Sequence, residues 1–266
     1  MKSAVKRIKV ILLVSFYVLL QYIVSVSAAV IYIIWNMAKG LTIAQAQKCA
    51  IEGAFALTVI ASIVTVWIYM LIYKFRKKDI SEYVPNKKVP MIIIMMSGCL
   101  AIGMRFLVAA YYYLVQNVGI FEKSIQRATE ISPELTTVVQ VFVAVFGTII
   151  VAPLFEEFLF RGLVMSELLK IMRPWASIIL QAILFAVAHG GLFQGMFTFV
   201  VGIVLGIIYY RTRSINATVV CHSIFNLSAV LMLEDMTGPT IVLFSVAGII
   251  ISALSMFYIF ANTQRR

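Results

Sequence analysis

Charged residues are scarce in this chain of 266 residues, and their scarcity limits the class of protein it can be. Asp, Glu, Lys and Arg make up 12% of the residues and hydrophobic residues 62%, with a mean hydropathy of +1.01. A soluble domain carries about 25% charged residues. The longest polar segments, 74–90 and 116–133, are too short to bury a core. The composition excludes a soluble globular protein and predicts one integral membrane domain over residues 1–266.

Cysteine and histidine are also rare, which excludes several kinds of site. The three cysteines, Cys49, Cys99 and Cys221, are widely spaced and form no CxxC pair, so a zinc ribbon or a dithiol redox centre is not expected. The HExxH motif of soluble zinc proteases and the GxSxG motif of serine hydrolases are both absent. The only two histidines, His189 and His222, both lie within apolar stretches.

Long apolar stretches dominate what remains. A transmembrane helix needs about 20 mostly apolar residues. Eight such stretches lie at about 10–35, 47–73, 91–115, 134–156, 174–190, 192–210, 215–232 and 240–261. We expect the fourth to begin at Ser132-Pro133-Glu134, which resembles a helix start, and it has room to continue as a helix to about residue 171. The sequence therefore predicts an all-α, polytopic membrane protein with about eight transmembrane helices.

The basic residues predict the orientation of these helices. Most of the 22 Lys and Arg fall on one side of an eight-span arrangement, in the N-terminal segment, in residues 74–88 and in the other loops of that side. Cytoplasmic loops carry this excess, so both termini are expected in the cytoplasm. The same bias accounts for the net charge of +11, and no nucleic-acid partner is needed. We expect a protein of a bacterial cell membrane, in contact with lipid.

Three of the apolar stretches contain side chains that are costly to place in a membrane. A charged residue at the centre of a bilayer costs about 2.5–3.5 kcal/mol on insertion scales, and such residues usually face a cavity and carry function. The candidate site residues are Glu156, Glu157, Arg161, His189, His222 and Asn226. Their presence predicts a polar cavity inside the membrane.

Helical spacing divides the two adjacent carboxylates between two roles. Glu157 and Arg161 are four residues apart with the acid first, which is the favourable order for an ion pair. Glu156 points about 100° away and remains available to face a cavity. We therefore expect one carboxylate for chemistry and one that holds the arginine.

Counting along the helices gives a mixed result for the histidines. A turn at Arg173-Pro174 brings His189 to about the height of Glu156. His222 shares a helix face with Asn226, one turn away. However, His222 begins only about eight residues above the basic turn at 211–213, so counting alone does not bring it to the height of His189. A tilted helix would be required.

A carboxylate with two imidazoles and an amide fits hydrolysis by activated water. The carboxylate can take a proton from water. The two imidazoles and the amide can bind a metal or stabilise an oxyanion. Zinc held by Glu156, His189 and His222 and a site without a cofactor are both compatible with these residues. Ser223 is a poor nucleophile candidate, because adjacent helical residues such as His222 diverge.

The three motifs together resemble a known family. Glu156-Glu157-x-x-x-Arg161, Phe185-x-x-x-His189 and His222-x-x-x-Asn226, in this order on successive spans, are similar to the motifs of the CPBP intramembrane proteases, also called the Abi family. That family includes type II CAAX prenyl endopeptidases and bacteriocin-processing or self-immunity proteins.

The resemblance implies a peptidase in which a glutamate activates water inside the membrane. Glu156 would be the base, with Glu157 and Arg161 in support, and with His189, His222 and Asn226 completing a core at about 133–232. The implied substrate is a prenylated CAAX protein or a peptide precursor. Two alternatives remain: a non-catalytic regulator or bacteriocin immunity protein of the same fold, and a proton-coupled transporter that uses these residues as a relay.

Two further features have structural interpretations. Arg105 lies within the third span, and we expect it to pair with Glu52. Gly202 and Gly206, four residues apart in the sixth span, are typical of close helix packing in membranes.

Overall fold

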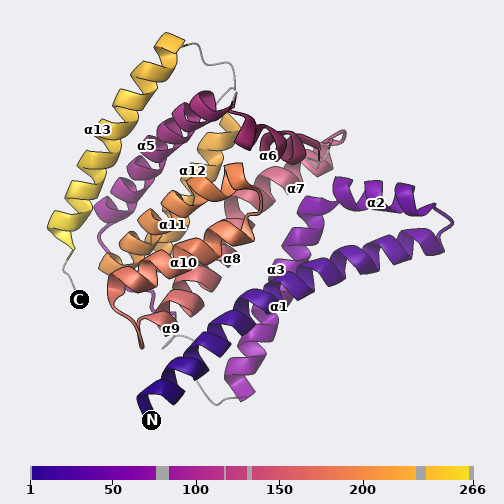
Figure 1. The fold of residues 1–266 in the computed structure, drawn as a ribbon, viewed down its shortest axis with the longest axis horizontal. Helices are drawn as coiled ribbons and strands as arrows, with labels where there is room; N and C mark the ends of the chain where they lie inside the picture. The colour runs from indigo at the N-terminus through magenta and orange to yellow at the C-terminus, as the bar shows by residue number, and fades with distance from the viewer. Residues whose placement is uncertain (1, 76–83, 117, 131–133, 232–237, 264–266) are drawn as a thin grey trace.

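The computed structural model describes residues 2–75, 84–116, 118–130, 134–231 and 238–263, and every regular element in these ranges is a helix (Figure 1). The helices are α1 (Lys2–Ala38), α2 (Ile43–Glu52), α3 (Ala54–Phe75), α5 (Met91–Val115), α6 (Gly119–Glu130), α7 (Val138–Phe146), η1 (Gly147–Val151), α8 (Ala152–Glu157), η2 (Phe158–Met165), α9 (Ser166–Leu168), α10 (Pro174–Ala188), α11 (Leu192–Thr212), α12 (Ile215–Leu231) and α13 (Gly238–Asn262).

The expected membrane architecture is confirmed, with the number of spans only approximate. Six described helical segments are long and apolar enough to cross a bilayer: Ala4–Ala38, Ala54–Phe75, Met91–Val115, Val138–Leu168, Leu192–Thr212 and Gly238–Asn262. Two shorter apolar helices, α10 and α12, account for the other two expected stretches. Large apolar side chains are exposed along α1, α3 and α13, as expected for helices that face lipid.

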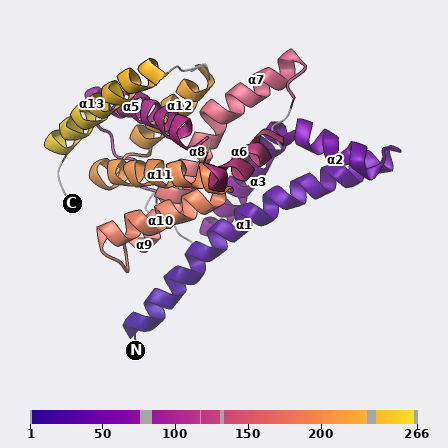
Figure 2. The same cartoon turned by 45° about the horizontal axis from the view of Figure 1, so that its top comes forward.

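The second expected stretch is divided into two helices. Thr42 and Gln45 form a reciprocal capping box that starts α2, since the Thr42 side chain accepts from the Gln45 amide and the Gln45 side chain accepts from the Thr42 amide. Gly53 ends α2, and α3 begins directly after it. Figure 2 shows α2 joining α1 and α3 at the far end of a hairpin. Hydropathy averaged over a window does not detect this division.

The fourth span begins later than expected. Thr137 is the N-cap of α7, and it forms a capping box with Gln140. Glu134 lies outside the helix, while Ser132 and Pro133 lie outside the described residues. The helix start expected at 132–134 is therefore wrong. The capping box of Thr137 and Gln140 satisfies two backbone amides at the first turn, and this stabilises a start at Thr137 more than a proline stabilises one at 133.

This fourth span contains two π-helical segments, η1 and η2, on either side of α8. Pro153 follows η1 at the start of α8. Proline lacks an amide hydrogen and crowds the preceding turn, and a wider turn relieves both problems. Short π segments occur often at functional sites. The span continues to Leu168, close to the expected limit of about 171.

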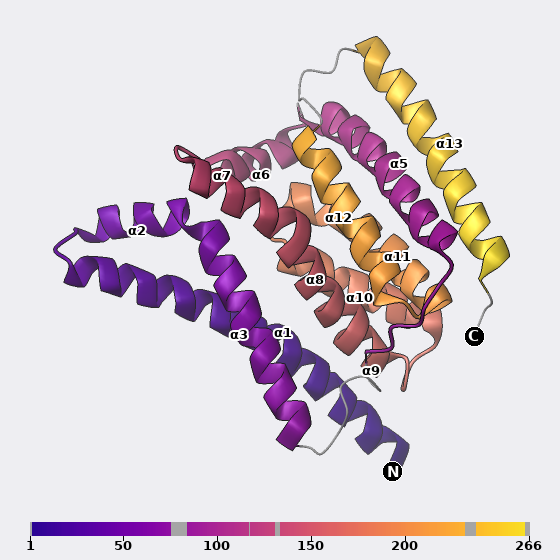
Figure 3. The ribbon, with the colours of Figure 1, turned by 180° about the vertical axis from the view of Figure 1, so that it is seen from behind.

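The helices pack as an N-terminal hairpin against a larger group of helices. Seen from behind, α1 and α3 pack against α8 and α9, with α2 at the far end of the hairpin, while α5, α12 and α13 lie side by side on the opposite flank (Figure 3). The buried cluster that joins the hairpin to η2 contains Val10, Val14, Tyr17, Tyr69, Tyr73, Leu159 and Leu163. The candidate site residues lie on α8, η2, the end of α10 and α12, which pack together beside the hairpin.

Two hydrogen bonds join the segment that precedes α5 to the residues at the start of α12. The amide of Lys87 donates to the carbonyl of Arg213 over 2.8 Å. The side chain of Asn86 donates to that of Asn216 over 2.9 Å. Further along, Gly98 lies against Ile224, where a Cβ on the glycine would come within 2.6 Å of the isoleucine. The two helices therefore run in the same direction from adjacent starts.

Glycines also allow the close packing of α10 and α11. Gly190 and Gly191 join the two helices with φ angles of 63° and 59°, which glycine adopts without strain. A Cβ on Gly202 would lie 3.1 Å from the Cα of Ala182. The close approach expected at Gly202 is thus confirmed, and it brings the backbone of α11 against the side of α10.

Candidate active site

The ion pair expected within the first motif is present and fully buried. Arg161 Nη1 lies 2.8 Å from Glu157 Oε1, and both side chains are 0% exposed. The second guanidinium nitrogen donates to the carbonyl of Gly202 over 3.3 Å, and the guanidinium lies 4.5 Å from the ring centre of Phe185. Separating the two side chains would leave an uncompensated buried charge, which is costly in free energy. The pair is therefore expected to stay together.

Glu157 also contacts the third motif. Its Oε1 atom lies 2.9 Å from Nδ1 of His222, whose side chain is 5% exposed. One carboxylate oxygen therefore connects Arg161 on η2 with His222 on α12. A carboxylate in this position sets the orientation and the tautomer of an imidazole. Glu157 thus contacts His222 as well as Arg161, a link that helical spacing alone did not indicate.

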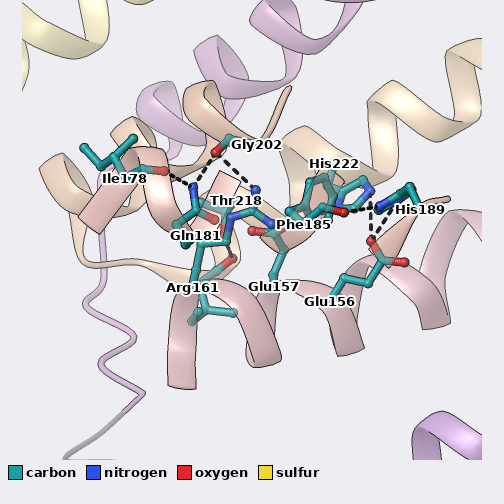
Figure 4. A network of polar contacts seen from close by, with 11 residues as sticks. Glu156, Glu157, Arg161, Ile178, Gln181, Phe185, His189, Gly202, Thr218 and His222 are labelled. Atoms are coloured by element: carbon teal, nitrogen blue, oxygen red, sulfur yellow. Dashed lines mark hydrogen bonds and ion pairs between the residues drawn. The ribbon is translucent and has the colours of Figure 1, made fainter. Parts of the chain in front are cut away.

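Glu156 faces both histidines. Its Oε2 atom lies 3.6 Å from Nε2 of His189 and 3.8 Å from Nε2 of His222 (Figure 4). The structure therefore brings together the residues of all three motifs, including the histidine that residue counting failed to align. The number of residues from a loop gives the height of a side chain in the membrane only if the compared helices have the same tilt. Nothing in the sequence requires α10 and α12 to have the same tilt.

The opposite nitrogens of the imidazoles indicate their tautomers. His189 Nδ1 lies 2.8 Å from the carbonyl oxygen of Phe185, which can only accept, so this nitrogen carries a hydrogen. His222 Nδ1 faces the carboxylate of Glu157 and carries one for the same reason. In neutral imidazoles the two Nε2 atoms then present lone pairs to Glu156.

Three acceptors thus converge at Glu156. Its Oε2 atom is buried, and no hydrogen-bond partner reaches it from the described residues. An arrangement of a carboxylate oxygen and two imidazole lone pairs is favourable only if a water, a proton or a cation lies between them. The geometry therefore favours a small hydrogen-bond donor or a cation between Glu156 and the two imidazoles.

Asn226 holds the π segment next to the site. Its Nδ2 atom donates to the carbonyl of Thr148 over 2.9 Å. Thr148 belongs to η1, where the altered backbone hydrogen bonding makes a carbonyl available. The second Nδ2 hydrogen is left for another partner. Asn226 and His222 both border the same cavity, as their spacing of one turn predicted.

The cavity has a volume of about 360 Å³ and is bordered by six helical parts of the chain: α3, α5, the η1–α8 region, the end of α10, α11 and α12. Glu156, His189, His222 and Asn226 lie in its wall, together with Thr58, Ser62, Arg105, Gln194 and Thr198. The expected Arg105–Glu52 pair is not observed; Glu52 lies 3.8 Å from Lys48 in its own helix.

Gln181 is a residue of the network that sequence reasoning missed. Its buried Nε2 atom donates to the carbonyls of Ile178 and Gly202 over 2.9 and 2.8 Å. The Gly202 carbonyl also accepts from Arg161, so Gln181 and the arginine share one acceptor (Figure 4). A glutamine within an apolar span was the available signal, since polar side chains there commonly bond to a neighbouring helix.

The donor atoms are of the kind that binds zinc, but they do not form a closed set. Two ligands of a tetrahedral zinc with bonds of about 2.0–2.1 Å lie about 3.4 Å apart, which is near the 3.6 and 3.8 Å from Glu156 to the histidines. Among the described residues, however, no group of three or more His, Cys, Asp or Glu is arranged to hold a metal ion.

Comparison with known proteins agrees with the motifs. Residues 138–228 match the family described as Type II CAAX prenyl endopeptidase Rce1-like, a segment that begins with α7 and ends within α12. No curated protein matches the chain. The matched segment, residues 138–228, contains all six candidate residues, and the match agrees with the family that the three motifs resemble.

Proposed function

We propose that this protein is an intramembrane endopeptidase that hydrolyses a peptide bond with a water activated by Glu156. One observation carries the proposal. Glu156 Oε2 faces Nε2 of both histidines across 3.6 and 3.8 Å, at the wall of a cavity of about 360 Å³. A carboxylate and imidazoles placed around one water are the groups that general acid–base hydrolysis requires.

The proposed reaction begins with a water that donates one hydrogen to Glu156 and the other to an imidazole Nε2. Glu156 removes the first proton as the water oxygen attacks the carbonyl carbon of the substrate. The C–N bond then breaks, and the proton held by Glu156 passes to the departing amine. The carboxylate returns to its starting form, so protons balance over the cycle.

The developing oxyanion needs hydrogen-bond donors. The second Nδ2 hydrogen of Asn226 is one, because only the first is used by Thr148. The imidazole that does not accept from the water is another; it enters and leaves the cycle protonated at Nε2, so the proton balance is unchanged, and its positive charge would strengthen the bond. Glu157 would stabilise that charge on His222 from the opposite side of the ring, over 2.9 Å. These assignments give every motif residue a role.

A zinc ion is the alternative means of activating the water. Glu156, His189 and His222 would hold it, and it would supply a Lewis acid and a more acidic bound water. We favour the route without metal, since Asn226 is a poor zinc ligand and a good oxyanion donor.

The wider proposal follows the family and the composition. The substrate is a prenylated CAAX protein or a peptide precursor. The chain forms one domain over residues 1–266 with its catalytic core at about 133–232. Both termini face the cytoplasm of a bacterial cell.

The test is a cleavage assay with the purified protein in lipid vesicles, using mass spectrometry of peptide libraries that include prenylated CAAX peptides. We expect discrete internal cleavage that Glu156→Gln abolishes. Glu52→Gln, the same chemical change outside the cavity, is the matched control and should cleave normally. Tight peptide binding without cleavage would instead favour a regulator or an immunity protein, and proton-coupled uptake would favour a transporter.

A further inference from the structure

Arg105 is the one lysine or arginine among the described residues that border the cavity. It is half-buried on α5, and the proposed reaction gives it no role. An ionisable side chain placed within a membrane span is costly and commonly marks a substrate path. The cavity thus contains a negative group, Glu156, and a positive group, Arg105, on different helices.

The register between α5 and α12 gives the separation of these groups along the cavity. Gly98 of α5 lies against Ile224 of α12, and this contact within the two helices gives their local offset. By that offset, Met96 lies level with His222. Arg105 follows Met96 by nine residues, a rise of about 13 Å. Because side chains on a helix lean toward its N-terminus, the guanidinium reaches back toward the histidines.

An extended peptide covers about 3.4 Å per residue, so 13 Å corresponds to about four residues, and the reach of the arginine side chain reduces this to two to four. A volume of about 360 Å³ is near the lower end for ligand sites, and it suits a short segment of chain. A substrate carboxylate would be repelled by Glu156 and attracted by Arg105. The charges would therefore allow one direction of the peptide and disfavour the reverse.

We propose that Arg105 binds a carboxylate of the substrate two to four residues from the scissile bond, and so sets the direction and the position of cleavage. The carboxylate is either the C-terminus of the peptide or the side chain of Asp or Glu. Arginine suits this task because its planar guanidinium can bind both carboxylate oxygens. A substrate carboxylate need not be its only partner. The inference rests on the proposed peptidase function and names the feature of the substrate that the site selects.

Binding measurements test this without relying on turnover. The probes are a fluorescein-labelled aliphatic hexapeptide with a C-terminal carboxylate, the same peptide as a C-terminal amide, and an amide that carries Glu at its last position. They are titrated against Glu156→Gln protein in lipid vesicles by fluorescence anisotropy. We expect the acid to bind at least about tenfold more tightly than the plain amide, in line with a charge-assisted hydrogen bond.

Variants of the Glu156→Gln protein show which residue causes the preference for the acid peptide. Adding Arg105→Gln should remove the preference, and Arg105→Lys should keep part of it. Lys123→Gln removes a positive charge from the exposed surface of α6 and should change nothing. Thermal unfolding checks that each variant is folded. If the Glu-containing amide binds like the acid, side-chain carboxylates are recognised; if it binds like the plain amide, the terminus is.

The outcomes also separate this inference from the proposed function. No preference for the acid peptide, or a preference that survives Arg105→Gln, overturns the inference even if the wild type cleaves peptides. A preference that depends on Arg105, in a wild-type protein that cleaves none of the three probes and no library peptide, overturns the hydrolysis and leaves the inference in place.

Discussion

Two ion pairs with the same helical spacing distinguish the N-terminal hairpin from the motif-bearing half. In α2, Lys48 and Glu52 lie 3.8 Å apart with side chains 73% and 36% exposed. In the first motif, Arg161 and Glu157 lie 2.8 Å apart with both side chains fully buried. The first pair is screened and contributes little. The second is costly to bury and is maintained by further contacts.

The buried polar groups of the two regions differ in the same way. Within the hairpin, the hydroxyls of Tyr17 and Tyr73 lie 2.6 Å apart, and Tyr69 donates to the carbonyl of Tyr17 over 2.6 Å. These groups are neutral and satisfy one another. In the motif-bearing half the network is charged and leads to Glu156 Oε2, which faces the cavity without a hydrogen bond from the described residues. Chemistry is expected where the network ends at a cavity.

The largest effect is expected at Glu156. Changing it to Gln keeps the shape but removes the base, so turnover should fall by about 10³-fold or more, with the thermal unfolding temperature nearly unchanged. Cleavage rates in vesicles measure this, beside Glu52→Gln as the control. Near-normal turnover in Glu156→Gln with a loss in Glu157→Gln would reverse the roles of the two carboxylates.

Glu157→Gln should mainly affect stability. It leaves Arg161 buried without its carboxylate, which typically costs about 3–5 kcal/mol. Glu52→Gln, at the exposed pair with the same spacing, should cost less than about 1 kcal/mol. Unfolding of the detergent-solubilised proteins by denaturant gives both values. Equal losses in the two variants would show that burial does not distinguish these pairs.

Chelation separates the two means of activating water. Without a metal, a strong chelator should leave the cleavage rate within about twofold of the untreated enzyme, because general acid–base catalysis needs only the protein groups. Elemental analysis of the purified protein should then find no stoichiometric metal. Loss of activity that added zinc restores, together with bound zinc that His189→Ala and His222→Ala each remove, would contradict this expectation.

The smallest effect is expected in the hairpin. Tyr73→Phe removes one hydroxyl from a neutral hydrogen bond and should lower the free energy of unfolding by about 1 kcal/mol, with no change in cleavage. A large loss of activity would mean that the tyrosines of the hairpin are coupled to the cavity, and the contrast between the two regions would fail.

Much of the fold was predictable because the bilayer requires long apolar helices, and hydropathy reports them directly. The Glu157–Arg161 pair was predictable because it depends only on helical spacing. The height of His222 was not, since helix tilt is set by packing between distant segments. The bond from Asn226 to Thr148 was also hidden, because it needs a π segment whose formation depends on tertiary contacts.

The two π segments have a consequence for how this sequence can change. Each wide turn contains about one residue more than an α-helical turn would, and one residue corresponds to a rotation of about 100°. Deleting a single residue from η1 would let the turn relax to an ordinary helix and would leave the length of the span almost unaltered. It would rotate α7 relative to α8, however. The apolar side of α7 could then not face the lipid while the carboxylates of α8 keep their present contacts. Substitutions here are thus easier to accommodate than insertions or deletions, because the number of residues in 147–151 sets how α7 is oriented relative to the glutamates.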